Sequence, residues 1–254
     1  MIKDTETIFL FDVDGTLTPS RCMMTDAIRN MLTVLRQQVM IGFVGGSDLA
    51  KQQEQMGADC LNLFDLGFPE NGVSFYKNGV LVAQQKIIDV MGEELYKKFV
   101  NFCLEYLSKL DIPIKRGTFI EYRNSMINIS PIGRNCSKEE RKDFKEYDSK
   151  YKIREKMVER LRENFEKHNL HFSIGGEISI DCFPVGWDKR HCLDYIQKMG
   201  IKRIYFFGDM THQGGNDYEI FEDPRTIGVN VKNPEDTILK VEEKLKELNR
   251  SLYN

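Results

Sequence analysis

Two aspartates separated by one residue, Asp12 and Asp14, follow an apolar run and lead into Gly15-Thr16. Two carboxylates at this spacing, with a glycine that releases the turn, can hold a hard cation such as Mg²⁺ through oxygen. One can also attack phosphorus while the other donates or accepts a proton. An EF-hand loop is excluded because its twelfth position is Met23, where a glutamate is needed. An ordinary Asp-Gly turn is the alternative, and on this motif alone the two interpretations are equally good.

Two later residues suit the same chemistry. Ser47 follows Gly45-Gly46 and opens a predicted helix, so its hydroxyl and the free backbone N–H groups there can bind a phosphate. Simple helix capping by Ser47 or Asp48 is the alternative. Lys189 is predicted to open a helix and to neutralise a phosphorylated carboxylate, although a lysine alone is more often solvated surface.

A second acidic station follows a buried strand near the end of the chain. Asp209 ends that strand as Asp12 ends the first one, and residues 214–217, Gly-Gly-Asn-Asp, come shortly after. Ligands of open α/β sheets bind at the carboxyl ends of the strands, so Asp12 and Asp209 can share one metal ion. The glycines match neither a Walker nor a dinucleotide-binding pattern. The sequence thus contains, in this order, the Asp12/Asp14 motif, Ser47, Lys189 and Asp209. Together these four features indicate one phosphoryl-transfer site.

Alternating strands and helices must position these residues. A continuous apolar run over residues 7–13 is typical of a strand buried on both faces. The alternation of strands and helices along the chain predicts a parallel sheet with right-handed crossovers. The predicted helices are 25–37, 48–56, 188–198, 216–221 and 234–248, and the further strands are 40–44, 203–207 and 226–229.

The middle of the chain has a different pattern. Asn78-Gly79, between apolar residues 73–76 and 80–82, predicts a type I′ hairpin. Beyond it we expect an inserted α+β cap with antiparallel strands. The predicted fold class is therefore α/β, a Rossmann-like core with a parallel sheet (residues 1–85 and 186–254) plus an inserted cap (86–185). The cap's predicted helices are 93–110 and 138–168, and its strands are 118–123, 126–130 and 178–183.

Composition narrows the classes of protein. The 254 residues are 41% apolar and 30% charged, as in ordinary globular proteins. The net charge of −3 gives no overall basic field for nucleic acid or an anionic membrane. The six cysteines are dispersed without a CxxC pair, so neither a zinc site nor a disulfide framework is indicated. With no signal peptide or membrane span recognisable, we expect a cytosolic protein.

The order DxDGT, serine, lysine and GD…ND resembles the haloacid dehalogenase superfamily, in which the first aspartate becomes an aspartyl phosphate. More closely, residues 12–21, 68–79, 121–141, 175–193 and 208–228 look like eukaryotic phosphomannomutase. This resemblance implies interconversion of mannose 6-phosphate and mannose 1-phosphate, which supplies GDP-mannose. It also implies a hexose phosphate substrate, priming by a hexose 1,6-bisphosphate, and a homodimer formed through the cap.

The resemblance also implies site residues. A mutase must grip the distal phosphate of a bisphosphate, and arginine forks suit phosphate through bidentate bonds. We expect Arg154, Arg160 and Arg162 merely to coat cap helices, and Met126 and Asn128 to line the substrate pocket. The implied substrate contacts are Arg21, Arg123, Arg134, Arg141, Ser179 and Asp181.

In the implied mechanism, Asp12 is the nucleophile and Asp14 the acid and base. Mg²⁺ is held by Asp12, the Asp14 carbonyl and Asp209, and a second cation lies near Phe221, Asp223 and Thr226. A sugar phosphatase of the same fold is the main alternative, and an inactive sugar-phosphate sensor is a second. The sequence does not separate mannose from glucose.

Overall fold

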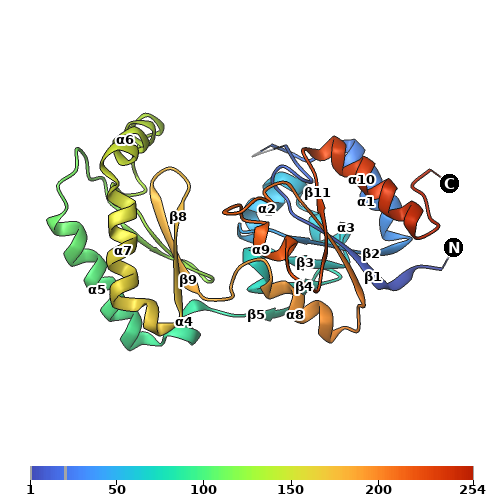
Figure 1. The fold of residues 1–254 in the computed structure, drawn as a ribbon, viewed down its shortest axis with the longest axis horizontal. Coiled ribbons are helices and arrows are strands. Elements are labelled where there is room, and N and C mark those ends of the chain that lie inside the picture. Colours follow the sequence, from blue (N-terminus) through green and yellow to red (C-terminus); the bar gives the residue numbers. More distant parts are fainter. Residues whose placement is uncertain (1, 20–21, 254) are drawn as a thin grey trace. The chain divides into compact units, whose positions relative to one another are not determined.

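The structure is a computed structural model that describes residues 2–19 and 22–253. The chain separates into two units, which Figure 1 shows and which are described one at a time. The core unit comprises Met1–Gln84 and Gly186–Asn254, and the cap unit is the intervening segment Gln85–Val185. Among the described residues, no helix combines the length and the apolar character that a membrane span requires.

A seven-stranded sheet in the order β11-β10-β1-β2-β3-β4-β5 organises the core unit (Figure 1). Strands β11, β10, β1, β2 and β3 are parallel, and β4 and β5 form an antiparallel hairpin at one edge. This arrangement confirms the α/β fold class. The strands are β1 (Asp4–Phe11), β2 (Val39–Val44), β3 (Leu66–Phe68), β4 (Ser74–Lys77), β5 (Val80–Gln84), β10 (Arg203–Gly208) and β11 (Ile227–Asn230).

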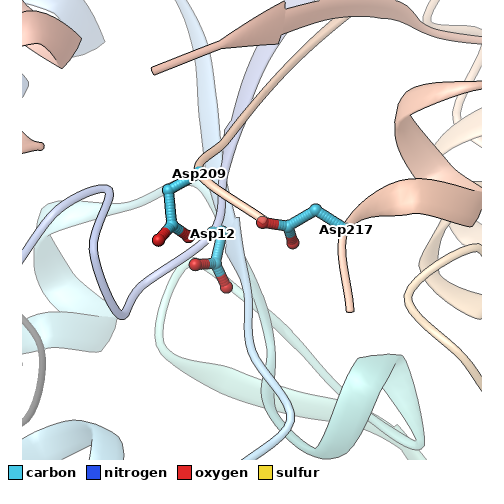
Figure 2. Close-up of side chains that lie close together, drawn as sticks. All are labelled: Asp12, Asp209 and Asp217. Carbon is cyan, nitrogen blue, oxygen red and sulfur yellow. The ribbon is translucent and has the colours of Figure 1, made fainter. Parts of the chain in front are cut away.

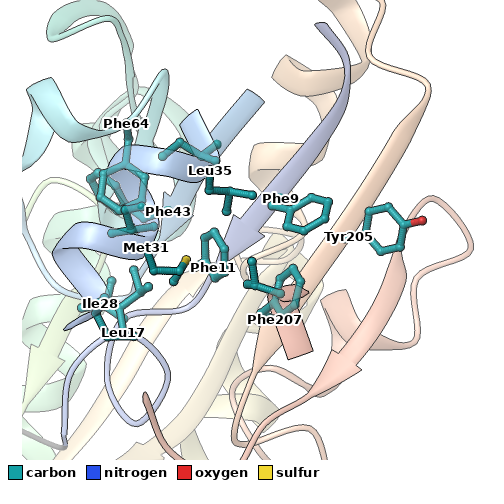
Figure 3. Packing of buried hydrophobic residues seen from close by; sticks show 14 of the residues in the cluster. Phe9, Phe11, Leu17, Ile28, Met31, Leu35, Phe43, Phe64, Tyr205 and Phe207 are labelled. Carbon is teal, nitrogen blue, oxygen red and sulfur yellow. The ribbon is translucent and has the colours of Figure 1, made fainter. Parts of the chain in front are cut away.

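Helices cover both faces of the core sheet, so the side chains on both faces of β1 are buried. Phe9 and Phe11 pack in a cluster that contains Leu35 of α1 (Figure 3). Ile8 and Leu10 point to the opposite face, where they share a cluster with residues of α8. The helices are α1 (Asp26–Arg36), α2 (Leu49–Met56), α3 (Cys60–Leu63), α8 (His191–Lys198), α9 (Tyr218–Phe221) and α10 (Pro234–Glu247), and a 3₁₀ turn spans Pro69–Gly72.

Local signals explain most element boundaries. The Thr25 side chain caps α1, as the sequence predicts. Asn78 and Gly79 both have positive φ, 48° and 79°, which confirms the predicted type I′ turn between β4 and β5. The prediction that Lys189 opens α8 is wrong, since the helix begins at His191. The Asp188 carboxylate accepts the Arg190 N–H at 2.9 Å and thereby holds residues 188–190 in a turn.

A four-stranded antiparallel sheet in the order β6-β7-β9-β8 forms the cap unit. Helices α5 and α7 pack on this sheet, where Phe99 of α5 stacks on Phe172 of β8 with ring centroids 6.2 Å apart. The predicted cap strands are present, and β8 is an addition. The elements are α4 (Ile87–Met91), α5 (Glu93–Lys109), β6 (Ile120–Tyr122), β7 (Ile127–Ile129), α6 (Lys138–Tyr151), α7 (Ile153–Phe165), a 3₁₀ turn (Glu166–His168), β8 (Leu170–Gly175) and β9 (Ser179–Pro184).

The single helix predicted over residues 138–168 is wrong. Lys152 adopts a left-handed conformation, with φ of 56°, and separates α6 from α7. Asp148 stabilises the break, because its carboxylate accepts the backbone N–H and the Nε–H of Arg154, each at 2.8 Å. A left-handed residue satisfies the last carbonyls of a helix and ends it.

The expectation that Arg154 coats a helix surface is also wrong. Arg154 is 6% exposed, pairs with Asp148, and donates to the carbonyls of Gly176 and Ser179 at 3.0 and 3.2 Å. Its guanidinium therefore joins α7 to the loop between β8 and β9. By contrast, Arg160 is exposed and pairs with Glu163 on its own helix.

We predict that Arg154→Ala lowers the free energy of unfolding by about 3–5 kcal/mol, because it leaves the Asp148 carboxylate buried without its partner. Arg160→Ala is the control and costs about 0.5 kcal/mol, since it removes an exposed pair on one helix. Urea unfolding followed by circular dichroism measures both. Equal, small losses in the two variants would contradict a buried structural role for Arg154.

Candidate active site

Three aspartates from different segments of the core unit meet at the carboxyl end of the sheet. Asp12 follows β1 and Asp209 follows β10, and these neighbouring parallel strands align Phe11 with Phe207. Asp217 lies just before α9. One carboxylate oxygen from each aspartate lies within 4.8 Å of the others, and Figure 2 shows the three side chains together. The parallel pairing of β1 with β10 therefore brings together the two acidic segments that lie far apart in the sequence.

Lys189 lies among these carboxylates. Its ammonium pairs with Asp12 and, at 2.5 Å, with Asp217. The exposed fractions are 3% for Asp12, 2% for Lys189 and 0% for Asp217, so the ions are shielded from solvent. When all four groups are ionised, three negative charges face one positive charge. In that fully ionised form the cluster carries a net negative charge.

Burial and the neighbouring charges shift the pKa values of Asp12, Asp209 and Lys189. Burial raises the pKa of Asp12 to about 7, an effect that Lys189 opposes and Asp217 reinforces. Burial and then the charge of Asp217 raise the pKa of Asp209. Burial alone lowers the pKa of Lys189, but the charges of Asp12 and Asp217 outweigh it and the pKa rises above its ordinary value. Proton binding and cation binding are two ways to relieve the same repulsion.

The donor set fits a hard divalent cation. Carboxylate oxygens are the ligands that Mg²⁺ and Ca²⁺ prefer. The Oδ1 atom of Asp209 is buried, and no described residue forms a hydrogen bond with it. A buried polar atom without a partner is costly, so a ligand at this point is favoured. Asp12, Asp209 and Asp217 are the residues that can hold the ion.

A tight turn places Asp14 beside this cluster. The N–H of Gly15 donates to the Thr18 carbonyl at 2.8 Å, and the N–H of Thr18 donates to the Val13 carbonyl at 3.0 Å. Gly15 has φ of +80°, and a Cβ atom there would overlap the carboxylate of Asp209. Glycine is thus required for both its conformation and its size. The Asp14 carboxylate itself accepts a hydrogen bond from Gln55 at 2.7 Å.

Ser47 is half-buried in the loop between β2 and α2. Asp48, not Ser47, caps α2, because its carboxylate accepts the Lys51 N–H at 2.9 Å. The Ser47 carbonyl accepts the N–H of Glu70, a residue with φ of 52° in the 3₁₀ turn. Capping therefore does not use the Ser47 hydroxyl, and its role as a phosphate ligand stays a prediction.

The predicted second cation site lies in the loop after α9. Both carboxylate oxygens of Asp223 accept hydrogen bonds from Arg225 at 2.8 Å, and this contact lowers the pKa of Asp223. The Thr226 hydroxyl donates to the Ile220 carbonyl at 2.6 Å, and Phe221 is half-buried. Arg225 already supplies a positive charge here. A cation bound by Phe221, Asp223 and Thr226 stays a prediction.

The cap unit carries a second polar cluster, on the sheet. Glu121, Asn128 and Asp181 are neighbours across β6, β7 and β9. Asn128 donates to Asp181 at 2.6 Å and accepts from Arg134 at 2.5 Å. Ser179 precedes Asp181 by two residues on β9, so both lie on the same face of the strand. Because successive side chains of a strand point to opposite faces, these polar residues lie on the face opposite the apolar residues of β7 and β9. We call these residues, with Arg123 and Arg141, the cap polar row.

Arginines dominate the charge of the cap polar row. Arg123 and Arg134 both contact the Glu121 carboxylate, at 2.5 and 3.2 Å, and Arg141 donates to the Arg134 carbonyl at 3.2 Å. Burial and the charge of Arg123 lower the pKa of Arg134, while burial raises the pKa of Asp181. Three guanidinium groups beside two carboxylates suit an anionic, hydroxyl-bearing ligand. Arg21, the remaining predicted substrate contact, lies outside the described residues.

Two residues of the core site, Asp217 and Gln55, are not among the predicted site residues. Asp217 follows the same strand as Asp209, in the acidic segment 214–217, and its position in that loop is the signal that could have identified it. Gln55 gave no signal, because a glutamine in a helix has no special spacing. Only the packing of α2 against the Asp14 turn brings it into contact.

A mostly parallel core sheet with an inserted antiparallel cap unit is a haloacid dehalogenase-like fold. The trehalose-6-phosphate phosphatase of Aspergillus fumigatus is a similar solved structure, with a TM-score of 0.61 over 94% of this chain and 92% of that chain. The sequence identity is 15%, so this likeness concerns the fold alone.

The chain belongs to the eukaryotic phosphomannomutase family, whose model matches residues 28–247. It is 63% identical to a phosphomannomutase of Encephalitozoon cuniculi, over 98% of this chain and 97% of that protein. It is 55% identical to a phosphomannomutase of Saccharomyces cerevisiae, over 92% of each. Both relatives span almost the whole chain, so the core and cap units are shared with them.

We predict that Gly15→Ala abolishes divalent-cation binding, because the new methyl group displaces Asp209. Gly200→Ala is the matched control, since Gly200 has nearly the same φ, +79°, but a methyl group there would meet no atom within 4 Å. Both variants lose roughly 1–2 kcal/mol from backbone strain. Isothermal titration with Mg²⁺ separates them, and parental affinity in Gly15→Ala would contradict the assigned contact.

Proposed function

We propose that this chain is a phosphomannomutase that interconverts mannose 6-phosphate and mannose 1-phosphate. The family membership and the two relatives support this activity. The buried cluster of Asp12, Lys189, Asp209 and Asp217 is the structural observation that carries it. A carboxylate nucleophile beside a buried ammonium suits repeated gain and loss of a phosphoryl group.

Mg²⁺ is the proposed cofactor. The donors would be Asp12, the Asp14 carbonyl and Asp209, with Asp217 close by. When bound, the ion neutralises phosphate charge and aligns the phosphoryl group for attack. The unpartnered Oδ1 atom of Asp209 and the net negative charge of the cluster support this assignment.

Four side chains have separate roles in the proposed reaction. An oxygen of Asp12 attacks phosphorus, and the bond from phosphorus to the sugar oxygen breaks. Asp14 gives a proton to that departing oxygen, and it takes a proton back when a sugar hydroxyl attacks phosphorylated Asp12. Lys189 compensates the negative charge that develops next to it, and Ser47 binds the transferring phosphoryl group.

A mutase must hold the phosphate that does not react. We propose that the cap polar row binds it through Arg123, Arg134 and Arg141, with Arg21 as a further contact, while Ser179 and Asp181 bind sugar hydroxyls. A hexose 1,6-bisphosphate would prime the enzyme and would reorient between the two transfers. A sugar phosphatase needs one phosphate site and a water, so three arginines in the row favour the mutase. An inactive sugar-phosphate sensor would not need the Asp12–Lys189 pair.

Four further features belong to the same proposal. The resemblance to the family implies a homodimer through the cap unit and a second cation near Asp223. It also implies that the product feeds GDP-mannose synthesis. A reducing compartment such as the cytosol suits six free thiols, five of them buried.

We predict that Asp12→Asn lowers mutase activity by a factor of about 10⁴, because an amide cannot replace the attacking carboxylate. Asp26→Asn, on the exposed first turn of α1, keeps parental activity. A coupled assay with mannose 1-phosphate, Mg²⁺ and a catalytic amount of bisphosphate measures both isomer and free inorganic phosphate. Release of inorganic phosphate faster than isomer formation by the parent would establish the phosphatase instead.

We predict that Asp217→Asn weakens Mg²⁺ binding. Saturating Mg²⁺ at 100 times its Kd stabilises the parent by about 2.7 kcal/mol, and the variant should gain much less. Glu219→Gln, an exposed neighbour, is the control and keeps the full gain. Thermal unfolding with and without Mg²⁺ gives the gain for each protein. An unchanged gain in Asp217→Asn would exclude this carboxylate from the cation site.

A further inference from the structure

Gln55 is a buried polar residue that makes a direct contact with Asp14. Its side chain is 7% exposed, and its Nε2 atom donates to Oδ1 of Asp14 at 2.7 Å. Gln53, on the same helix, instead donates to the Ala58 carbonyl at an exposed position. The Gln55 amide thus binds Asp14 in the turn that follows Asp12, the proposed nucleophile.

The backbone of Gln55 holds the other end of that loop. Its carbonyl accepts the N–H of Met24 at 2.8 Å. One residue of α2 therefore fixes both Asp14 and Met24. Because α2 begins directly after the Ser47 loop, the same helix links this loop to the Asp14 turn.

The side-chain torsions of Asp14 determine where its carboxyl group points. The bonds between Val13, Gly15 and Thr18 already fix its backbone. A hydrogen bond to Oδ1 sets the rotation of the carboxyl group and makes its two oxygens different. Since Oδ1 accepts the amide N–H, the position of Gln55 determines how the carboxyl plane of Asp14 is turned.

Packing does not require an amide at this position. The Oε1 atom of Gln55 is buried, and no described residue donates to it. Such an atom costs about 1–3 kcal/mol. A methionine of similar length would fill the space without that cost. The contact with Asp14 is what the amide adds.

We propose that Gln55 is a positioning residue, which orients Asp14 for proton transfer to the departing sugar oxygen. This inference rests on the proposed function of Asp14. In that step an oxygen of Asp12 bonds to phosphorus and the bond from phosphorus to the sugar oxygen breaks. The electron pair stays on the sugar oxygen, which takes the proton from Asp14. The products are a sugar hydroxyl, phosphorylated Asp12 and ionised Asp14.

Leaving-group dependence tests this role. An aryl phosphate such as 4-nitrophenyl phosphate leaves as a stable anion and needs no proton, whereas a sugar alkoxide does. We expect Gln55→Met to lower kcat with mannose 1-phosphate by about 10–100-fold, with KM nearly unchanged. Release of 4-nitrophenolate in a single turnover, with enzyme in excess, should stay within about twofold of the parent.

Three further variants make the result decisive. Gln55→Glu keeps the shape but lacks the N–H donor, so it should show the same leaving-group dependence if Gln55→Met folds poorly. Gln53→Met is the control on the same helix and should match the parent with both substrates. Asp14→Asn should show the leaving-group dependence in its strongest form.

Equal losses with both phosphate esters, a change in KM alone, or no loss would each overturn the positioning role. Failure of the proposed function looks different. The parent would then hydrolyse mannose 1-phosphate without forming the isomer. Hydrolysis needs the same proton on the sugar oxygen, so the comparison of the two esters still tests Gln55.

Discussion

The buried ion pair between Lys189 and Asp12 is the interaction on which the rest of the core site depends. These residues lie 177 positions apart in the sequence, and Asp217, the second partner of Lys189, is a further 28 positions away. Moving one such ion out of water costs several kcal/mol, so the cluster is stable only when its members compensate each other. The two halves of the core unit must therefore fold together before the site exists. Parallel pairing of β1 with β10 provides that junction.

Compensation within the cluster is incomplete, and this gives the site its chemistry. Three carboxylates surround one ammonium, and the pKa of Asp12 rises to about 7 as a result of burial and of this crowding. In the proposed reaction, a divalent cation and a phosphoryl group would bring charges of both signs to this cluster. The turn closed around Gly15 fixes the backbone of Asp14, the proposed proton donor. The cap polar row has the opposite charge balance, with guanidinium groups in excess, which suits the distal phosphate of the proposed function.

Sequence patterns predicted the features that depend on local rules. The apolar run before Asp12, the Thr25 cap and the Asn78-Gly79 turn each have a short-range cause, and each is confirmed. Features set by tertiary contacts were not predictable. The break at Lys152 depends on a buried bond between Asp148 and Arg154, which also removes Arg154 from the surface. Gln55 joins the site only because helix packing brings it there, and a glutamine in a helix has no spacing that predicts such a role. Asp217 lies in an acidic segment that the sequence indicates, but only the fold of its loop shows that it reaches Asp12.

Trapping the phosphorylated enzyme would identify which aspartate carries the phosphoryl group. The protein is mixed with a hexose 1,6-bisphosphate and Mg²⁺, quenched, and reduced with borohydride, which converts an aspartyl phosphate to homoserine. Peptide mass spectrometry then locates the modified residue. We predict homoserine at position 12 and at no other aspartate. Homoserine at another position, or none in a preparation that converts mannose 1-phosphate to mannose 6-phosphate, would contradict it.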